Sequence, residues 1–269
     1  MSNAEALEIY SKIANVEDGK PLAMVCCICK DRTSLVEPVP IIEGPWRGRW
    51  FPKTAHDSCI DREQKFQTQK ELLENSGLVY PGDKTFDNFD TYNKGLEIAL
   101  GRTMKFADEL IKQNGQSERQ VIHGPWLIGP NGRGKSHLME ALVYYLVCHG
   151  IRARYLSVAQ LLFDLQMSFG NDEQGMLKSE TFWSNTTARV LAMDNLGIGK
   201  ASEWAKSVLF NMLEFRVVAK RPTAIAMDES PGEIGKQWHE RIPSRAFRLC
   251  GDPIVVAGAD YSIRNLKSQ

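Results

Sequence analysis

The sequence lacks several features that mark whole classes of protein. Its apolar stretches fall well short of the about 20 residues that a membrane-spanning helix needs, and Met1–Glu5 shows neither the basic start nor the apolar run of a signal peptide. Neither charge is in excess, because 33 Lys and Arg residues balance 33 Asp and Glu residues. Internal repeats and low-complexity tracts are also missing. These absences predict a cytoplasmic protein with no membrane partner, and they argue against one whose main role is to coat nucleic acid.

The chain divides into parts of different composition. Residues 1–76 hold four of the six Cys residues and several Pro residues but no long periodic pattern. This predicts a small module that must be stabilised by something other than a large hydrophobic core. Residues 77–94, which include Pro81-Gly82, predict a linker. Residues 95–269 alternate helical patterns with continuous apolar strands. That alternation predicts an α/β core, with a parallel sheet covered by helices on both faces.

The elements of this core can be placed approximately along the chain. We expect strands at 126–128, 154–157, 190–193, 223–227 and 254–257. We expect helices at 135–148, 158–167 and 203–219, and a long amphipathic helix through 96–111.

A glycine-rich loop stands between the strand 126–128 and the helix after it. Residues 129–136 match G-x-x-x-x-G-K-S without a gap, in the strand–loop–helix context that the motif requires. Glycine allows the backbone to approach phosphate closely, and N–H groups at a helix N-terminus bind anions. The loop predicts a site for ATP or ADP, in which Lys135 neutralises phosphate charge and Ser136 binds Mg²⁺. Its expected nucleotide-binding residues are Gly129, Pro130, Asn131, Gly132, Arg133, Gly134, Lys135, Ser136 and His137.

A carboxylate for the same Mg²⁺ follows the buried strand 190–193. This strand ends in Asp194, and a strand-end Asp is the usual partner of a phosphate-binding loop in holding Mg²⁺. An Asp at the end of any buried strand looks the same, so the prediction depends on the loop upstream.

The cysteines of the first part form two close groups. Cys26 and Cys29 make a C-x₂-C, and His56 and Cys59 make an H-x₂-C further along the chain. Two such pairs separated by a loop are how a small chain builds a tetrahedral Zn²⁺ site. We therefore predict a Cys₃His structural zinc site, in which Cys27 could replace one ligand with less suitable spacing. Unrelated reduced thiols beside a surface His are the alternative.

Five stretches, in order along the chain, share features with one family. They are Phe86–Asp90, Gly134–Leu138 with His-Leu after the Ser, Asp194–Gly197, Arg221–Ser230 and Glu240–Arg245. Together they resemble the AAA+ ATPases of the DnaC/DnaI replicative helicase-loader type, over about residues 85–265. The resemblance implies a P-loop AAA+ fold. Because the chain ends soon after Gly258, we expect this fold to lack a C-terminal lid.

The resemblance also implies a function. A loader binds a hexameric replicative helicase, helps to place it on single-stranded DNA during replication initiation, and self-assembles in a nucleotide-dependent manner. Residues 1–76 would then bind the helicase, and residues 95–269 would be the ATPase core. Two other functions stay open: an IstB-like transposition ATPase, and an ATP-gated helicase adaptor or inhibitor with little hydrolysis. A stand-alone ATPase with a small-molecule partner ranks last, because nothing between the loop and Asp194 is typical of an acceptor-substrate site.

Two departures from the family pattern leave ATP hydrolysis open. The family has an acidic residue after the Walker B Asp, where this chain has Asn195, and an amide cannot act as a general base. The sensor 1 position, which is neutral in the family, falls here on Asp228. One hypothesis is that the two strand ends exchange roles, so that Asp228 orients water and Asn195 is the polar sensor. The alternative is a slow or inactive ATPase that uses ATP as a switch.

Three arginines near the C-terminus could act on a neighbouring subunit. Arg241, Arg245 and Arg248 are spaced so that they would share one face of a helix. A solvated basic face is the ordinary outcome of such spacing. By resemblance to the family's arginine-finger box, we expect Arg245 to reach the γ-phosphate on a neighbouring subunit.

Overall fold

The computed structural model describes residues 68–116, 120–167, 181–197 and 202–261, and within residues 1–67 the backbone of five short strands. The chain divides into two compact units, Met1–Thr68 and Gln69–Gln269, and each is described by itself. Among the described residues, no helix combines the length and the apolar character needed to cross a bilayer.

The described strands of the first unit pair antiparallel. β1 (Val16–Glu17) pairs with β2 (Lys20–Pro21). β4 (Leu35–Pro40) pairs with β3 (Met24–Val25) and with β5 (Trp50–Lys53). The four predicted zinc ligands lie outside the described residues, and so the zinc site stays a prediction: Cys26, Cys29, His56 and Cys59.

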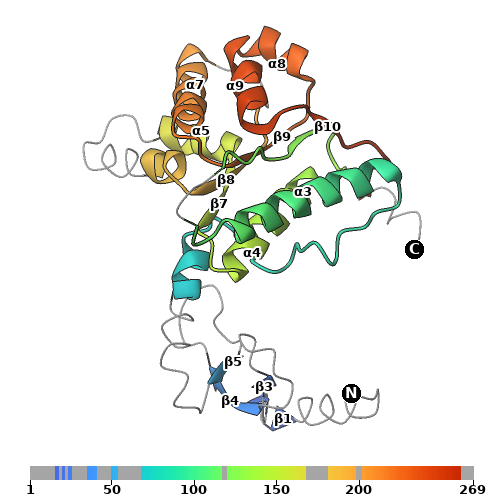
Figure 1. The fold of residues 1–269 in the computed structure, drawn as a ribbon, viewed down its shortest axis with the longest axis vertical. Coiled ribbons are helices and arrows are strands. Elements are labelled where there is room, and N and C mark those ends of the chain that lie inside the picture. The colour runs from blue at the N-terminus through green and yellow to red at the C-terminus, as the bar shows by residue number, and fades with distance from the viewer. Residues whose placement is uncertain are drawn as a thin grey trace. The chain divides into compact units, whose positions relative to one another are not determined.

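A five-stranded parallel sheet forms the centre of the second unit (Figure 1). Its strands are β6 (Trp126–Ile128), β7 (Ala153–Ser157), β8 (Val190–Asp194), β9 (Thr223–Met227) and β10 (Ile254–Val255). Their order across the sheet is β10-β6-β9-β8-β7, and each neighbouring pair is parallel. β9 therefore lies between β6, which leads into the glycine loop, and β8, which ends in Asp194.

Helices cover both faces of this sheet, as the sequence predicts. One face carries α3 (Lys94–Lys112) and α4 (Lys135–Cys148) (Figure 1). The other face carries α5 (Val158–Met167), α7 (Glu203–Val218), α8 (Pro231–Gln237) and α9 (Arg241–Cys250). Short helical segments also occur at 68–74 and 181–186.

The central strands β6, β8 and β9 are almost entirely apolar because each contributes side chains to two separate cores. In β8, Val190 and Ala192 pack into the core beneath α3 and α4, whereas Leu191 and Met193 pack into the core on the opposite face. Successive side chains of a strand point to opposite faces, so a sheet covered on both sides needs apolar residues at every position.

The expected and observed elements agree closely, with one clear omission. The strands 126–128 and 223–227 and the helices 135–148 and 158–167 have the predicted bounds, and β10 is shorter than expected. The sequence pattern does not predict α8, because its seven residues include two glycines and show no apolar period. A capping box starts this helix, because Ser230 accepts from the Glu233 N–H and Glu233 accepts from the Ser230 N–H.

Candidate nucleotide-binding site

The glycine loop joins β6 to α4 and has a backbone that only glycine adopts easily. Gly129, Gly132 and Gly134 have φ angles of 147°, 73° and 85°, in the region that disfavours residues with a Cβ. A Cβ on Gly132 would collide with the Asp260 carboxylate, and a Cβ on Gly134 would lie 2.7 Å from the Phe89 ring. Conformation and close packing therefore both require glycine in this loop.

The N-terminus of α4 differs from those of α3, α7 and α8, although α9 also starts without a side-chain cap or an acidic residue in its first turn. Side chains cap α3, α7 and α8, and each of these helices has an acidic residue in its first turn. α4 begins at Gly134 with no side-chain cap and no acidic residue in its first turn. Its first N–H groups are left available, and with the positive end of the helix dipole they suit a phosphate.

The Lys135 ammonium lies inside the loop, with its side chain only 6% exposed. It donates to the carbonyl oxygens of Gly129 at 2.6 Å and Pro130 at 2.8 Å, and it forms an ion pair of 2.8 Å with Asp228 Oδ1. With its amide nitrogen turned toward this carboxylate, Asn131 donates to Asp228 Oδ2 at 2.7 Å. The Asp228 carboxylate, at the end of β9, therefore binds the loop through Lys135 and Asn131. A bound phosphate would compete with it for the Lys135 ammonium.

Arg133 adds a second cation to the loop. Two of its guanidinium nitrogens, Nε and Nη1, are buried and have no hydrogen-bond partner in the structure. A buried donor without an acceptor costs free energy unless a ligand or water supplies one. Arg133, Lys135 and the α4 N-terminus thus fit a polyanionic ligand.

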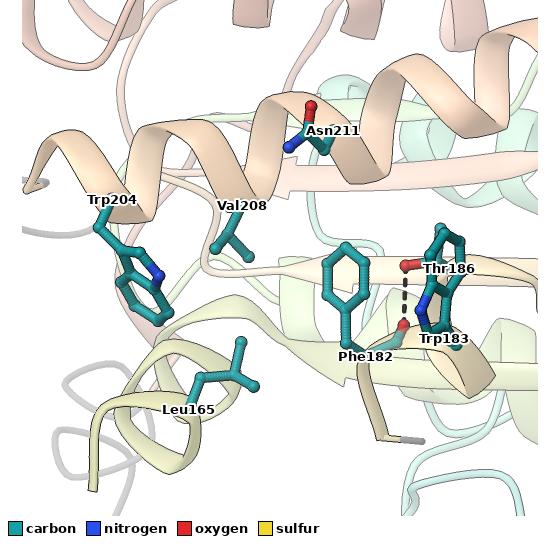
Figure 2. Close-up of a pocket in the computed structure, with 7 residues that line it drawn as sticks. All are labelled: Leu165, Phe182, Trp183, Thr186, Trp204, Val208 and Asn211. Atoms are coloured by element: carbon teal, nitrogen blue, oxygen red, sulfur yellow. Dashed lines mark hydrogen bonds between the residues drawn. The ribbon is translucent and has the colours of Figure 1, made fainter. Parts of the chain in front are cut away.

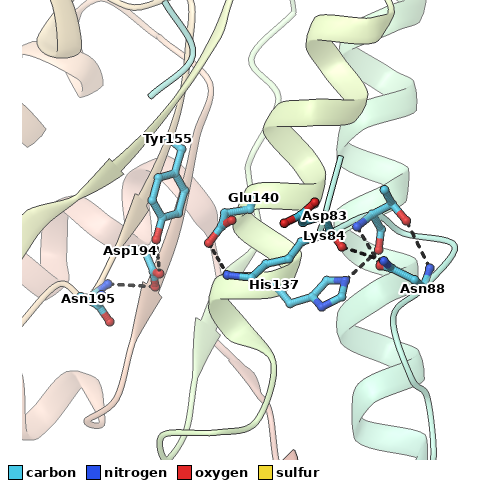
Figure 3. A network of polar contacts seen from close by, with 9 residues as sticks. Asp83, Lys84, Asn88, His137, Glu140, Tyr155, Asp194 and Asn195 are labelled. Atoms are coloured by element: carbon cyan, nitrogen blue, oxygen red, sulfur yellow. Dashed lines mark hydrogen bonds and ion pairs between the residues drawn. The ribbon is translucent and has the colours of Figure 1, made fainter. Parts of the chain in front are cut away.

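Asp194 lies at the end of β8 and is 1% exposed. Its Oδ2 accepts a hydrogen bond of 2.7 Å from the Tyr155 hydroxyl, and its Oδ1 accepts one of 2.9 Å from the Asn195 N–H (Figure 3). Both donors are neutral, so neither offsets the charge of this buried carboxylate. A divalent cation would offset it, and carboxylates are ligands that Mg²⁺ prefers.

A Mg²⁺ ion at Asp194 would also need ligands from outside the protein. The described residues contain no cluster of three or more His, Cys, Asp or Glu side chains that could hold a metal. Mg²⁺ commonly binds through one or two protein groups together with phosphate oxygens and water. Ser136 and Asp194 fit such a minimal set.

The backbone gives a reason for Asn195. This residue has a φ of 58°, in the left-handed region, where Asn is more favourable than most residues with a Cβ. Its N–H also orients Asp194. The left-handed turn thus explains the preference for Asn at position 195, whether or not this residue has a role in catalysis.

Residues ahead of α3, predicted as a linker, pack on α4. Lys84 forms an ion pair of 2.6 Å with Glu140, and His137 Nε2 donates to the Thr85 carbonyl at 2.8 Å (Figure 3). Burial lowers the pKa of His137 below its usual value of 6.5, which favours the neutral ring. His137, predicted to bind nucleotide, thus contacts this segment, and its ring centroid lies 5.2 Å from that of Phe89.

Two further polar residues, Tyr155 and Glu229, are not indicated by the sequence motifs. Tyr155 of β7 reaches Asp194 from the neighbouring strand. Glu229 follows Asp228, and its Oε2 is buried without a hydrogen-bond partner in the structure. A carboxylate directly after the predicted sensor position could have been noted from the sequence, whereas the Tyr155 contact depends on strand pairing.

The three arginines expected to face a neighbouring subunit lie on α9. Arg245 pairs through Nε with Glu214 of α7, and its guanidinium lies 5.4 Å from the centre of the Phe210 ring. Arg241 lies 5.9 Å from the same ring, and both Arg241 and Arg248 are exposed. Arg245 is therefore bound within its own chain, and its role toward a neighbouring subunit stays a prediction.

A pocket of about 430 Å³ opens between α5, the 181–186 segment and α7 (Figure 2). Its lining is mostly apolar, and the hydroxyl of Thr186 already donates to the Phe182 carbonyl at 2.7 Å. The pocket is lined by Leu165, Phe182, Trp183, Thr186, Trp204, Val208 and Asn211. None of these belongs to the glycine loop or is Asp194 or Asp228, so the pocket has no lining residue in common with the candidate nucleotide site.

The family described as IstB-like ATP binding protein matches residues 62–242, more than half of the chain. The chain belongs to this family. The replicative helicase loader DnaC of Escherichia coli (strain K12) is 21% identical over 189 residues, which cover 70% of this chain and 73% of that protein. These matches confirm the resemblance inferred from the motifs.

Two solved structures show the same fold. The crystal structure of DnaI has a TM-score of 0.54 and 20% identity, covering 71% of this chain and 93% of that one. The crystal structure of the DnaC helicase loader has a TM-score of 0.55 and 19% identity, covering 65% and 98%. The second unit therefore has the AAA+ P-loop fold of these proteins.

The ion pair between Lys135 and Asp228 predicts that Asp228→Asn binds nucleotide more tightly than the wild type. The substitution removes a competitor for the ammonium and a negative charge near the phosphates, and we expect about tenfold tighter binding, or ~1.4 kcal/mol. Titration of a fluorescent ATP analogue in EDTA measures this. Asp252→Asn, at an exposed Asp, is the matched control for charge. Equal or weaker binding by Asp228→Asn would contradict the prediction.

Proposed function

We propose that the protein is an ATP-regulated helicase loader, which binds a hexameric replicative helicase and helps to place it on single-stranded DNA during replication initiation. The observation that carries this proposal is a glycine loop with its strand-end carboxylates, in a fold shared with proteins named as helicase loaders.

The residues described above would hold the nucleotide and its metal. Lys135, Arg133 and the N–H groups of residues 129–136 would bind the phosphates, and Ser136 and Asp194 would bind Mg²⁺. Mg²⁺ would neutralise phosphate charge in this site. Arg245 or an exposed arginine of α9 would contact a neighbouring subunit in a nucleotide-dependent assembly.

The first unit would supply the contact with the helicase. Cys26, Cys29, His56 and Cys59 would bind one Zn²⁺ and hold this small module together. Contacts with single-stranded DNA would be weak, because the net charge of the chain is zero. The loader would act in the cytoplasm.

An IstB-like transposition ATPase is the second candidate, and the family match favours it. Its partners would be a transposase and duplex DNA. A third candidate, an ATP-gated adaptor or inhibitor that binds a helicase with little hydrolysis, is supported by Asn195 after Asp194. Binding to a transposase and duplex DNA instead of a helicase would identify the second candidate. Helicase binding with little ATP hydrolysis would identify the third.

We expect the chain of residues 1–269 to co-purify with the replicative helicase of its own cell or host. A chain of residues 69–269, which keeps both cores of the second unit, should still bind nucleotide but lose the helicase. Affinity capture followed by size-exclusion chromatography, with and without ATP, measures both properties. If the chain of residues 1–269 binds no helicase with ATP and none without ATP, the loader proposal is refuted.

The exchange of roles between Asn195 and Asp228 predicts a loss of turnover in Asp228→Asn. A positioned general base contributes on the order of 100-fold or more, and the amide removes it. Steady-state ATP hydrolysis at saturating nucleotide, with Asp252→Asn as control, measures the effect. If wild type and Asp228→Asn turn over equally, the exchange hypothesis is wrong, and only equal and very slow turnover would support ATP as a switch.

The cysteine spacing predicts one Zn²⁺ per chain. Replacing Cys26 and Cys29 by Ser should remove it, because a tetrahedral site does not survive the loss of two thiolates. Elemental analysis of purified protein gives the stoichiometry. Cys148→Ser, at an exposed thiol of the second unit, should retain the metal. Wild-type protein without stoichiometric zinc would exclude the site.

A further inference from the structure

A hydroxyl on β7 holds the carboxylate at the end of β8. Tyr155 pairs in register with Ala192, so its side chain reaches diagonally along the same face to Asp194. The O–H···Oδ2 distance is 2.7 Å, and Tyr155 and Asp194 point toward each other in Figure 3. A phenol is protonated at neutral pH, so the Tyr155 hydroxyl donates to the carboxylate.

This hydroxyl has a defined effect on the carboxylate. The Asn195 N–H binds Oδ1 and the Tyr155 hydroxyl binds Oδ2, so the two donors together fix the rotation of a carboxylate that is 1% exposed. Each oxygen keeps further lone pairs for a metal. Without the hydroxyl, one oxygen loses its donor, and the orientation depends on the backbone N–H alone.

The backbone of Tyr155 is bound by the chain segment that enters the second unit. β7 is an edge strand, and the Tyr155 N–H donates to the Ser76 carbonyl at 2.7 Å. Ser76 is fully buried, and its hydroxyl donates to the Leu73 carbonyl at 2.6 Å. Gly77 has a φ of 75°, and a Cβ there would collide with the Tyr155 carbonyl oxygen.

We propose that Tyr155 is a positioning residue for the Mg²⁺ ligand Asp194, and that residues 76–77 hold Tyr155 in place. A displacement of the segment that leads from the first unit into the core would then change Mg²⁺-dependent nucleotide binding. The proposal rests on the nucleotide site of the proposed function and is independent of which protein the first unit binds.

Tyr155→Phe tests the hydroxyl. Titration of a fluorescent ATP analogue at increasing Mg²⁺ should show a half-saturating Mg²⁺ concentration about fivefold higher than in the wild type, because one hydrogen bond to the carboxylate is lost. Affinity in EDTA should stay within about twofold, since the loop is untouched. Tyr145→Phe is the matched control, because its hydroxyl donates to Asp108 at 3.4 Å instead.

Gly77→Ala tests the backbone contact without changing Tyr155. We expect it to raise the half-saturating Mg²⁺ concentration to a similar extent as Tyr155→Phe. Gly150→Ala is the control, because Gly150 has a φ of 73° and no atom within 4 Å of a built Cβ. It therefore imposes the same backbone strain just ahead of β7 without a collision, and its Mg²⁺ dependence should match the wild type.

The outcomes distinguish failure of the Tyr155 role from failure of the nucleotide site itself. Unchanged Mg²⁺ dependence in both Tyr155→Phe and Gly77→Ala would overturn it, even if the melting temperature falls. If Tyr155→Phe does not fold, Gly77→Ala decides alone. A wild-type protein that binds no nucleotide would refute the proposed nucleotide site itself, whereas a wild type with Mg²⁺-dependent binding and unaffected variants would refute only the role of Tyr155.

Discussion

The position of β9 between β6 and β8 governs the chemistry at the end of the sheet. Parallel strands end at a common edge, so Asp228 at the end of β9 stands between the glycine loop and Asp194. In register, Ile128 pairs with Met227, and the next residues along the two strands are Gly129 and Asp228. This arrangement lets Asp228 reach Lys135 at 2.8 Å. A nucleotide at the loop must therefore share or displace a bond that the protein makes with itself.

The sequence predicted the parts of the fold that depend on local pattern. The apolar run and the glycine spacing within residues 126–136 predict a strand, a loop and the start of a helix. All three have the expected bounds. The central strands β6, β8 and β9 are almost entirely apolar because they face two cores, and this property predicted a sheet covered on both sides. The strand order is not local, so the contact between Lys135 and Asp228 could not be predicted from the sequence.

Side-chain partners were harder to predict for the same reason. Helical spacing places Arg241, Arg245 and Arg248 near one another, but only the packing of α9 against α7 brings Glu214 to Arg245. The motif placed His137 beside the nucleotide loop, yet its ring donates to the Thr85 carbonyl from the segment packed on α4. In both cases the sequence identified the residue type, and tertiary contacts decided what that residue binds.

The turn after Asp194 limits how this chain could hydrolyse ATP. Asn195 has a left-handed backbone with a φ of 58°, and Glu at that position would adopt this conformation less easily than Asn. Glu would also place a second negative charge next to a buried carboxylate whose hydrogen-bond donors are neutral, at a cost to both. The end of β9 is a less constrained place for a base, since Asp228 is part-exposed and already contacts the phosphate-binding lysine. Because residue 195 is Asn and supplies no base, the role-exchange hypothesis requires Asp228 to leave Lys135 when phosphate binds. Under the role-exchange hypothesis, the Lys135–Asp228 ion pair would link nucleotide binding to nucleotide turnover.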